Sequence, residues 1–176
     1  MSFLESLHDR VLVCDGAMGS MLYDRGVFVN QSFEALNLTR PALVVEVHRA
    51  YVDAGADVIE TNTFGANQLK LAGFGLADRF VEINVVGARL ARQAAGTSGY
   101  VAGAIGPLGV KVGDGGSTRV EAAETHFAEQ AAARAEDVDA EEVNLDDDTI
   151  LSDDEDEDDP VLSDLDDLDD DLDEDD

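Results

Sequence analysis

The sequence is poor in the residues that cross-link or stiffen a chain. Its 176 residues include one cysteine, three prolines and no tryptophan. A single cysteine, Cys14, excludes a disulfide within the chain and cannot by itself form a thiolate metal site. No apolar run approaches the roughly 20 residues that a membrane span requires, so we expect no membrane segment. The N-terminus lacks a basic segment followed by an apolar one, which argues against a signal peptide and predicts a cytoplasmic protein.

Basic residues are absent from the C-terminal part of the chain. All 11 Lys and Arg lie at or before Arg134, whereas 25 of the 40 acidic residues follow it. The net charge of −29 is therefore mostly a property of the tail and says little about a fold. We divide the chain into residues 1–134, with the composition of a folded domain, and an acidic tail, 135–176. The tail is predicted to be disordered because it has little apolar surface to bury.

One pattern interrupts the acidity of the tail. Four leucines spaced by three, three and four would share a helical face, although repulsion between carboxylates opposes that helix in isolation. They are Leu162, Leu165, Leu168 and Leu172. The acidic runs lack EF-hand spacing, so only diffuse cation binding is expected. A basic protein is a possible partner for the tail, whereas no nucleic-acid partner is expected. A natural extension, a frame-shifted end and an artificial end all fit its composition.

Apolar runs of strand length alternate with segments of helical periodicity before the tail. Strands are predicted at 11–14, 56–61 and 100–105, and helices at 42–54, at 78–95 and from near Thr118 to Arg134. Such alternation predicts right-handed crossovers and a parallel sheet, hence an α/β fold. The length of each unit fits a barrel and an open sheet equally well.

The loops that follow the predicted strands hold the most distinctive residues, and in an α/β barrel these loops build the active site. The first, 15–20, offers a carboxylate and glycines that let backbone N–H groups approach an anion. The second, 60–67, is polar with one aromatic residue, and the third, 103–107, is small and would leave space. Each alone also fits a common structural role, because Asp-Gly is a frequent turn and Thr/Asn-rich runs often precede helices.

Together, in this order, the loops resemble one family. Asp-Gly-Ala-Met-Gly-Ser at 15–20 and Glu-Thr-Asn-Thr-Phe-Gly-Ala-Asn at 60–67 are similar to motifs of the homocysteine S-methyltransferase family, in the version found in methionine synthases. The resemblance runs from about residue 11 to 134. It implies a partial (β/α)8 TIM barrel comprising the first three βα units, and transfer of a methyl group to the thiol of homocysteine to give methionine.

The resemblance also implies roles for individual residues. Asp15 matches the carboxylate that holds the ammonium group of homocysteine, and the N–H groups of Met18 and Gly19 match those that receive its carboxylate. A charge-assisted pair for the cation and a glycine-rich nest for the anion make physical sense of these roles. The residues that match the lining of the same pocket are Thr61, Thr63 and Phe64. Gly65 falls where the betaine-using branch carries a tyrosine, which favours a folate or cobalamin-linked methyl donor.

One departure from the family concerns the metal. The family activates the thiol on zinc held by three cysteines from late strands, two of them adjacent, and none has a counterpart here; a later glutamate that contacts the ammonium group is also unmatched. Cys14 is predicted to be a small buried strand residue. The three histidines are predicted on helical or terminal surfaces and not at a metal, and they are His8, His48 and His126.

Two hypotheses follow for the function. A free thiol is only a few per cent ionised at neutral pH, so we predict a homocysteine S-methyltransferase-type domain that holds no zinc, binds homocysteine weakly and is inactive alone. The alternative is a non-catalytic truncated fragment or an acidic interaction protein that binds a basic partner.

Overall fold

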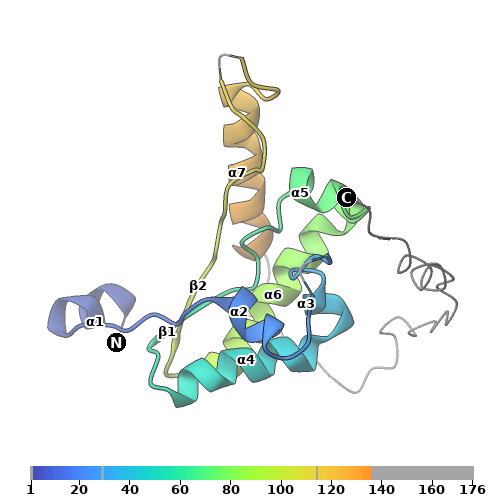
Figure 1. Ribbon diagram of the computed structural model, residues 1–176. Coiled ribbons are helices and arrows are strands. Elements are labelled where there is room, and N and C mark those ends of the chain that lie inside the picture. The colour runs from blue at the N-terminus through green and yellow to red at the C-terminus, as the bar shows by residue number, and fades with distance from the viewer. Residues whose placement is uncertain (1, 29, 114, 136–176) are drawn as a thin grey trace, which may run out of the picture.

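A computed structural model describes residues 2–28, 30–113 and 115–135 (Figure 1). The predictions for the tail, including its disorder and the shared leucine face, concern residues outside this range. The domain boundary at 134/135 also stays a prediction.

The described elements alternate between helices and short strands in an α/β order. They are α1 (Phe3–Asp9), α2 (Met18–Tyr23), α3 (Leu36–Thr39), α4 (Pro41–Asp53), β1 (Val58–Glu60), α5 (Gln68–Ala72), the 3-10 helix η1 (Ala77–Arg79), α6 (Phe80–Ala95), β2 (Tyr100–Ala102) and α7 (Val120–Ala135). Helices α4, α6 and α7 confirm the three predicted helices. The other helices have seven residues or fewer, too short for a periodic pattern to reveal.

Helix α4 begins at a residue type that favours a helix start, and α4 and α6 are each followed by a glycine that favours a helix end. Proline occupies the first position of α4, where its missing N–H costs nothing. Soon after α4 ends, Gly55 adopts φ 99°, and the C-cap of α6 is Gly96 with φ 63°. These left-handed conformations, which favour glycine, turn the chain toward β1 and β2.

The strands form a parallel pair, as predicted for crossovers through helices. Val58 is opposite Tyr100 and Glu60 is opposite Ala102. The segment around Cys14 lies along the other side of β1. There the Val13 carbonyl accepts hydrogen bonds from the Asp57 and Val58 N–H groups at 2.8 and 3.1 Å, and Asp15 N donates to the Val58 carbonyl at 2.9 Å. The spatial order is therefore this segment, β1, then β2.

The first predicted strand is wrong as a regular, buried strand. Within the described part of the chain it amounts to one isolated parallel bridge, between Cys14 and Val58, so only two regular strands are present. Val11 is 83% exposed and Val13 53% exposed. Cys14 is exposed too, which corrects its predicted burial. Among the described residues the segment pairs with β1 alone, and because its apolar side chains stay exposed it gains little from a regular ladder.

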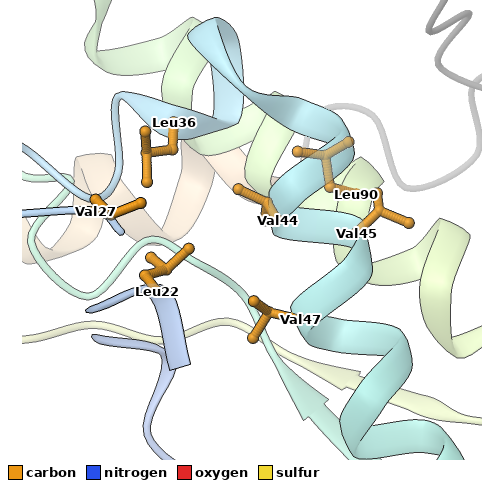
Figure 2. Close-up of a cluster of buried hydrophobic side chains, with 7 residues drawn as sticks. All are labelled: Leu22, Val27, Leu36, Val44, Val45, Val47 and Leu90. Carbon is orange, nitrogen blue, oxygen red and sulfur yellow. The ribbon is translucent and has the colours of Figure 1, made fainter. Parts of the chain in front are cut away.

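The main core lies between α4 and the elements around it, and Figure 2 shows its side chains converging. Its buried members are Leu22, Val27, Leu36, Val44, Val45, Val47 and Leu90. His48, predicted on a surface, is instead fully buried on α4. The histidine lies on the apolar face of α4, which packs into the core. The surface prediction was wrong because it followed the polar residue type and not the position on the helix.

A second cluster joins α7 to α6 and to the loop after β1. Its buried members are Ala66, Leu71, Phe80, Ile83 and Ala133. Figure 1 shows α7 projecting away from the rest of the fold at the top of the view, with its C-terminal end near α6. The loop that follows β1 therefore has helical support on one side. Among the described helices, none is both long and apolar enough to cross a membrane.

Candidate functional site

A hollow of about 580 Å³ lies beside the loops at the carboxyl ends of the strands. Its lining combines both motif loops, one segment between them and one residue after β2. The lining residues are Asp15, Gly16, Ala17, Met18, Gly19, Phe33, Glu34, Glu60, Thr61, Asn62, Phe64 and Ala104. Five of the six residues predicted to contact substrate are thus brought to one hollow, and the sixth, Thr63, lies behind its wall.

Asp15 sits where the first segment meets β1. Both of its carboxylate oxygens accept a hydrogen bond from Glu60 N at 3.1 Å. Partial burial raises the pKa of Asp15 to about 6, an effect opposed by the Glu60 N–H bond and reinforced by the nearby Glu60 carboxylate. The group is therefore mostly ionised at pH 7 and becomes neutral as the pH falls through about 6. In its ionised form it can hold a cationic group.

Met18 and Gly19 form the start of α2. The residue before them, Ala17, makes no side-chain cap hydrogen bond, so the N–H groups of the first turn have no cap from that position. The carbonyl of Ala17 accepts a hydrogen bond from the hydroxyl of Tyr51 on α4 at 3.1 Å, which ties the loop to the core. The first turn of α2 can therefore receive an external acceptor such as a carboxylate.

Thr61 and Thr63 join the loop after β1 to the chain after β2. Their hydroxyl oxygens are 2.6 Å apart. Thr63 Oγ1 donates to the Ala104 carbonyl at 2.9 Å, and Ala104 N donates to Thr61 Oγ1 at 3.0 Å. Both threonines are buried, whereas Phe64 is 55% exposed at the edge of the hollow. The Lys70 ammonium group lies 5.4 Å from the centre of the Phe64 ring.

Amide side chains buried behind this wall hold the loop after β1. Each donates to a backbone carbonyl of the loop from a different helix, and Asn62 Nδ2 in turn donates to Asn37 Oδ1 at 3.0 Å. The pairs are Asn37 Nδ2 with the Asn62 carbonyl at 2.9 Å, Gln130 Nε2 with Thr63 at 2.8 Å and Asn84 Nδ2 with Ala66 at 2.8 Å. Buried hydrogen-bonded networks of this kind favour a single conformation.

Sequence patterns missed several residues that line the hollow. Glu60 and Asn62 lie inside the recognised motif but received no role. Phe33 and Glu34 lie in a stretch before α3 with no periodicity, and no local signal marks them. Their place depends on the packing of distant segments, which only the structure supplies.

The comparisons with known proteins address the same region of the chain. The profile of the homocysteine S-methyltransferase family matches residues 12–143, about three quarters of the sequence. The chain belongs to the homocysteine S-methyltransferase family. The methionine synthases of Mycobacterium leprae and Mycobacterium tuberculosis are each 36% identical to it over 140 residues.

Solved structures agree with this membership. The homocysteine methyltransferase MmuM from Escherichia coli matches in its oxidized form with a TM-score of 0.54 and 32% identity, over 60% of this chain. Its metallated form matches with a TM-score of 0.51 and 30% identity, over 57% of this chain. The fold is thus an α/β fragment that resembles part of that family's barrel. The chain spans 12% of the length of either methionine synthase and 41% or 40% of the MmuM chain.

A metal is found in the family, as the metallated MmuM structure shows. The residues of this chain do not fit the three-cysteine zinc site that the resemblance implies, because the sequence has one cysteine and its thiol is exposed beside β1. Among the described residues, no group of three or more His, Cys, Asp or Glu could hold a metal ion.

Proposed function

We propose that the hollow binds the amino-acid end of homocysteine as part of a methyltransferase site. Family membership makes homocysteine the expected substrate. One observation carries the proposal: a carboxylate and an uncapped helix start line the same hollow, so the chain offers both charges that a zwitterionic amino acid needs. The carboxylate is Asp15, for the ammonium group, and the N–H groups are those of Met18 and Gly19, for the substrate carboxylate.

The wall formed after β1 would face the side chain of the substrate. Thr61 and Phe64 line the hollow, and Thr63 supports them from behind through its bonds to Thr61 and Ala104. In the family reaction the substrate thiol accepts a methyl group and loses its proton, giving methionine. We propose that this chain contributes amino-acid binding only, because a thiol with an ordinary pKa near 8.5 stays protonated without an activating group. The methyl donor is proposed to be folate or cobalamin linked.

Calorimetry with L-homocysteine under reducing conditions tests the binding role. We expect weak binding that Asp15→Asn reduces by about tenfold or more, since a charge-assisted bond is lost. Asp78→Asn, the same change at an exposed site, is the matched control and should have no effect. L-2-Aminobutyrate, which lacks the thiol, should bind nearly as well because only the amino-acid end is recognised. Equal affinities for the wild-type protein and Asp15→Asn would refute the assignment.

The pH dependence of binding gives a second test. Because the pKa of Asp15 is raised to about 6, the affinity should be full near pH 7.5 and should fall as the pH drops through about 6. Asp15→Asn should flatten this profile. Metal analysis and methyl-transfer assays should give no stoichiometric zinc and no methionine; one tightly held zinc per chain together with turnover would contradict the binding-only role.

A second function is suggested by the charge distribution. With 25 acidic and no basic residues after Arg134, the C-terminal part could bind a basic protein. We propose this as the alternative, in which the first 134 residues are non-catalytic. Removal of residues 135–176 should then abolish salt-sensitive binding to a basic protein such as a histone and leave homocysteine binding intact. Equal binding by the shortened chain would rule the alternative out.

A further inference from the structure

The segment 32–34 lies between the two loops that line the hollow, and it touches both. On one side, a Cβ placed on Gly19 would lie 3.2 Å from Cε2 of the Phe33 ring. On the other side, Asn62 Nδ2 donates a hydrogen bond to the Phe33 carbonyl at 2.7 Å. Phe33 and Glu34 both line the hollow. The segment therefore forms a wall that connects the proposed amino-acid end of the site with the loop after β1.

The carboxylate of Glu34 makes the most direct connection to that loop. Glu34 Oε1 accepts a hydrogen bond from Gly65 N at 2.6 Å. Its other oxygen, Oε2, accepts one from the hydroxyl of Ser32 at 2.9 Å. Hydrogen bonds to an ionised acceptor are shorter and about twice as strong as neutral ones. Glu34 is thus held from its own segment and in turn holds the backbone next to Phe64.

At position 65 only glycine leaves room for the carboxylate of Glu34. A Cβ at position 65 would touch Glu34 Oε1 and would lie 2.9 Å from Cδ and 3.2 Å from Oε2. The three nearest atoms all belong to Glu34, and the backbone of Gly65 is not left-handed. Nothing else near position 65 therefore opposes a methyl group as strongly. A side chain at 65 and the carboxylate of Glu34 in its present place exclude one another.

We propose that Glu34 is a positioning residue of the homocysteine pocket. Through the N–H group of Gly65 it holds the loop bearing Thr61 and Phe64 at a fixed distance from the loop bearing Asp15. Glycine at 65 is required because the carboxylate occupies the space of its side chain. This inference rests on the proposed function for the identity of the ligand. The coupling between Glu34 and Gly65 is independent of any ligand.

A double-mutant cycle measures that coupling. Gly65→Ala, Glu34→Ala and the double variant are compared by amide hydrogen exchange across 61–66. Each single change should speed exchange at residue 65 by about tenfold or more, because a charge-assisted bond is lost. The double variant should exchange no faster than Glu34→Ala alone, since the added methyl group then meets no carboxylate. Gly73→Ala, at the end of α5 and outside the hollow, is the control and should combine additively with Glu34→Ala.

Homocysteine affinity supplies a second readout that separates positioning from simple charge attraction. Glu34→Ala and Gly65→Ala should each raise the dissociation constant by about tenfold, and the double variant by no more. Glu34→Gln keeps an acceptor for Gly65 N and should recover most of the affinity. Equal losses for Glu34→Gln and Glu34→Ala, or additive losses for Glu34→Ala and Gly65→Ala, would overturn the proposal. If the wild-type chain binds no homocysteine, the proposed function fails, and the exchange cycle still confirms or refutes the role of Glu34.

Discussion

The two loops that line the hollow are held in different ways. The loop after β1, residues 61–67, is buried apart from Phe64, and amide side chains from α3, α6 and α7 donate to its carbonyls. The loop of residues 15–19 is half-exposed or exposed throughout. Its ties from other elements include the bonds of Asp15 to Glu60 N and to the Val58 carbonyl, the bond from the Tyr51 hydroxyl to Ala17 and the packing of Phe33 against Gly19.

This difference separates two parts of the proposed site. The wall facing the substrate side chain is fixed by side chains of the described helices, so it should keep its shape without ligand. The part proposed to bind the ammonium and carboxylate groups has no buried amide side chains donating to its carbonyls among the described residues, and it should adjust more easily. Buried polar networks are costly to disrupt because every lost partner leaves a desolvated group unpaired, whereas exposed bonds are replaced by water. Substitutions in the two loops should therefore differ in size.

Asn84→Ala should have the largest effect. Asn84 Nδ2 donates to the carbonyls of Ala66 and Phe80, both at 2.8 Å, and the side chain is fully buried. Its removal should lower the free energy of unfolding by about 2–4 kcal/mol, as measured by urea denaturation. Asn30→Ala, at an exposed position, is the control and should change stability by less than about 0.5 kcal/mol. A similar loss for both variants would mean that the amide network does not stabilise the loop.

Lowering the pH should destabilise α4 and, with it, the loop of residues 15–19, which is bonded to α4 through Tyr51. His48 of α4 is fully buried, neither ring nitrogen has a hydrogen-bond partner among the described residues, and burial lowers its pKa to about 4. In the unfolded chain the same group takes up a proton near pH 6.5. Stability from neutral His48 is therefore complete above pH 6.5 and is lost as the pH falls toward 4, by roughly 3 kcal/mol at most.

His48→Phe separates this effect from the titration of carboxylates. The variant should lose the part of the pH dependence that falls between 6.5 and 4, as measured by thermal unfolding at several pH values. Amide exchange near pH 5 should rise first in α4 and residues 15–19, and later in 61–67. An unchanged pH profile in His48→Phe would contradict the assignment.

Helix positions were predicted from the sequence more reliably than the first strand or the contacts behind the site. The apolar stripe of Phe80, Ile83 and Leu90 defines α6 in both sequence and structure, because its period depends only on local spacing. The strand around Val13 failed because regular pairing depends on neighbours that no local pattern encodes. The polar network was also hidden: Asn84 and Gln130 are far from the motif loops in sequence and meet them only after α6 and α7 pack.

Alanine substitutions at Gly87 and Gly19 should show the same difference between the two loops, with smaller changes in stability. A Cβ on Gly87 would lie 2.6 Å from Asn37 Nδ2 and 2.7 Å from Thr63 Cγ2, both in the buried network. A Cβ on Gly19 would meet only the Phe33 ring, at 3.2 Å, and that ring can shift. Gly87→Ala should cost about 1–3 kcal/mol of unfolding free energy and Gly19→Ala less than about 0.5 kcal/mol. A larger loss of unfolding free energy for Gly19→Ala than for Gly87→Ala in urea denaturation would contradict this, because it would show tighter packing around residues 15–19.

Tyr51→Phe should give a small and local change. The variant removes only the hydroxyl that donates to the Ala17 carbonyl at 3.1 Å, at an accessible site where water can replace it. We expect a loss of about 0.5–1 kcal/mol in unfolding free energy. Amide exchange should rise at Met18 and Gly19 and stay unchanged across 61–67, because no bond of the buried network involves Tyr51. Homocysteine affinity should fall by about threefold, since the N–H groups proposed to bind its carboxylate are less well held. Faster exchange in both loops at once would show that they move as one unit.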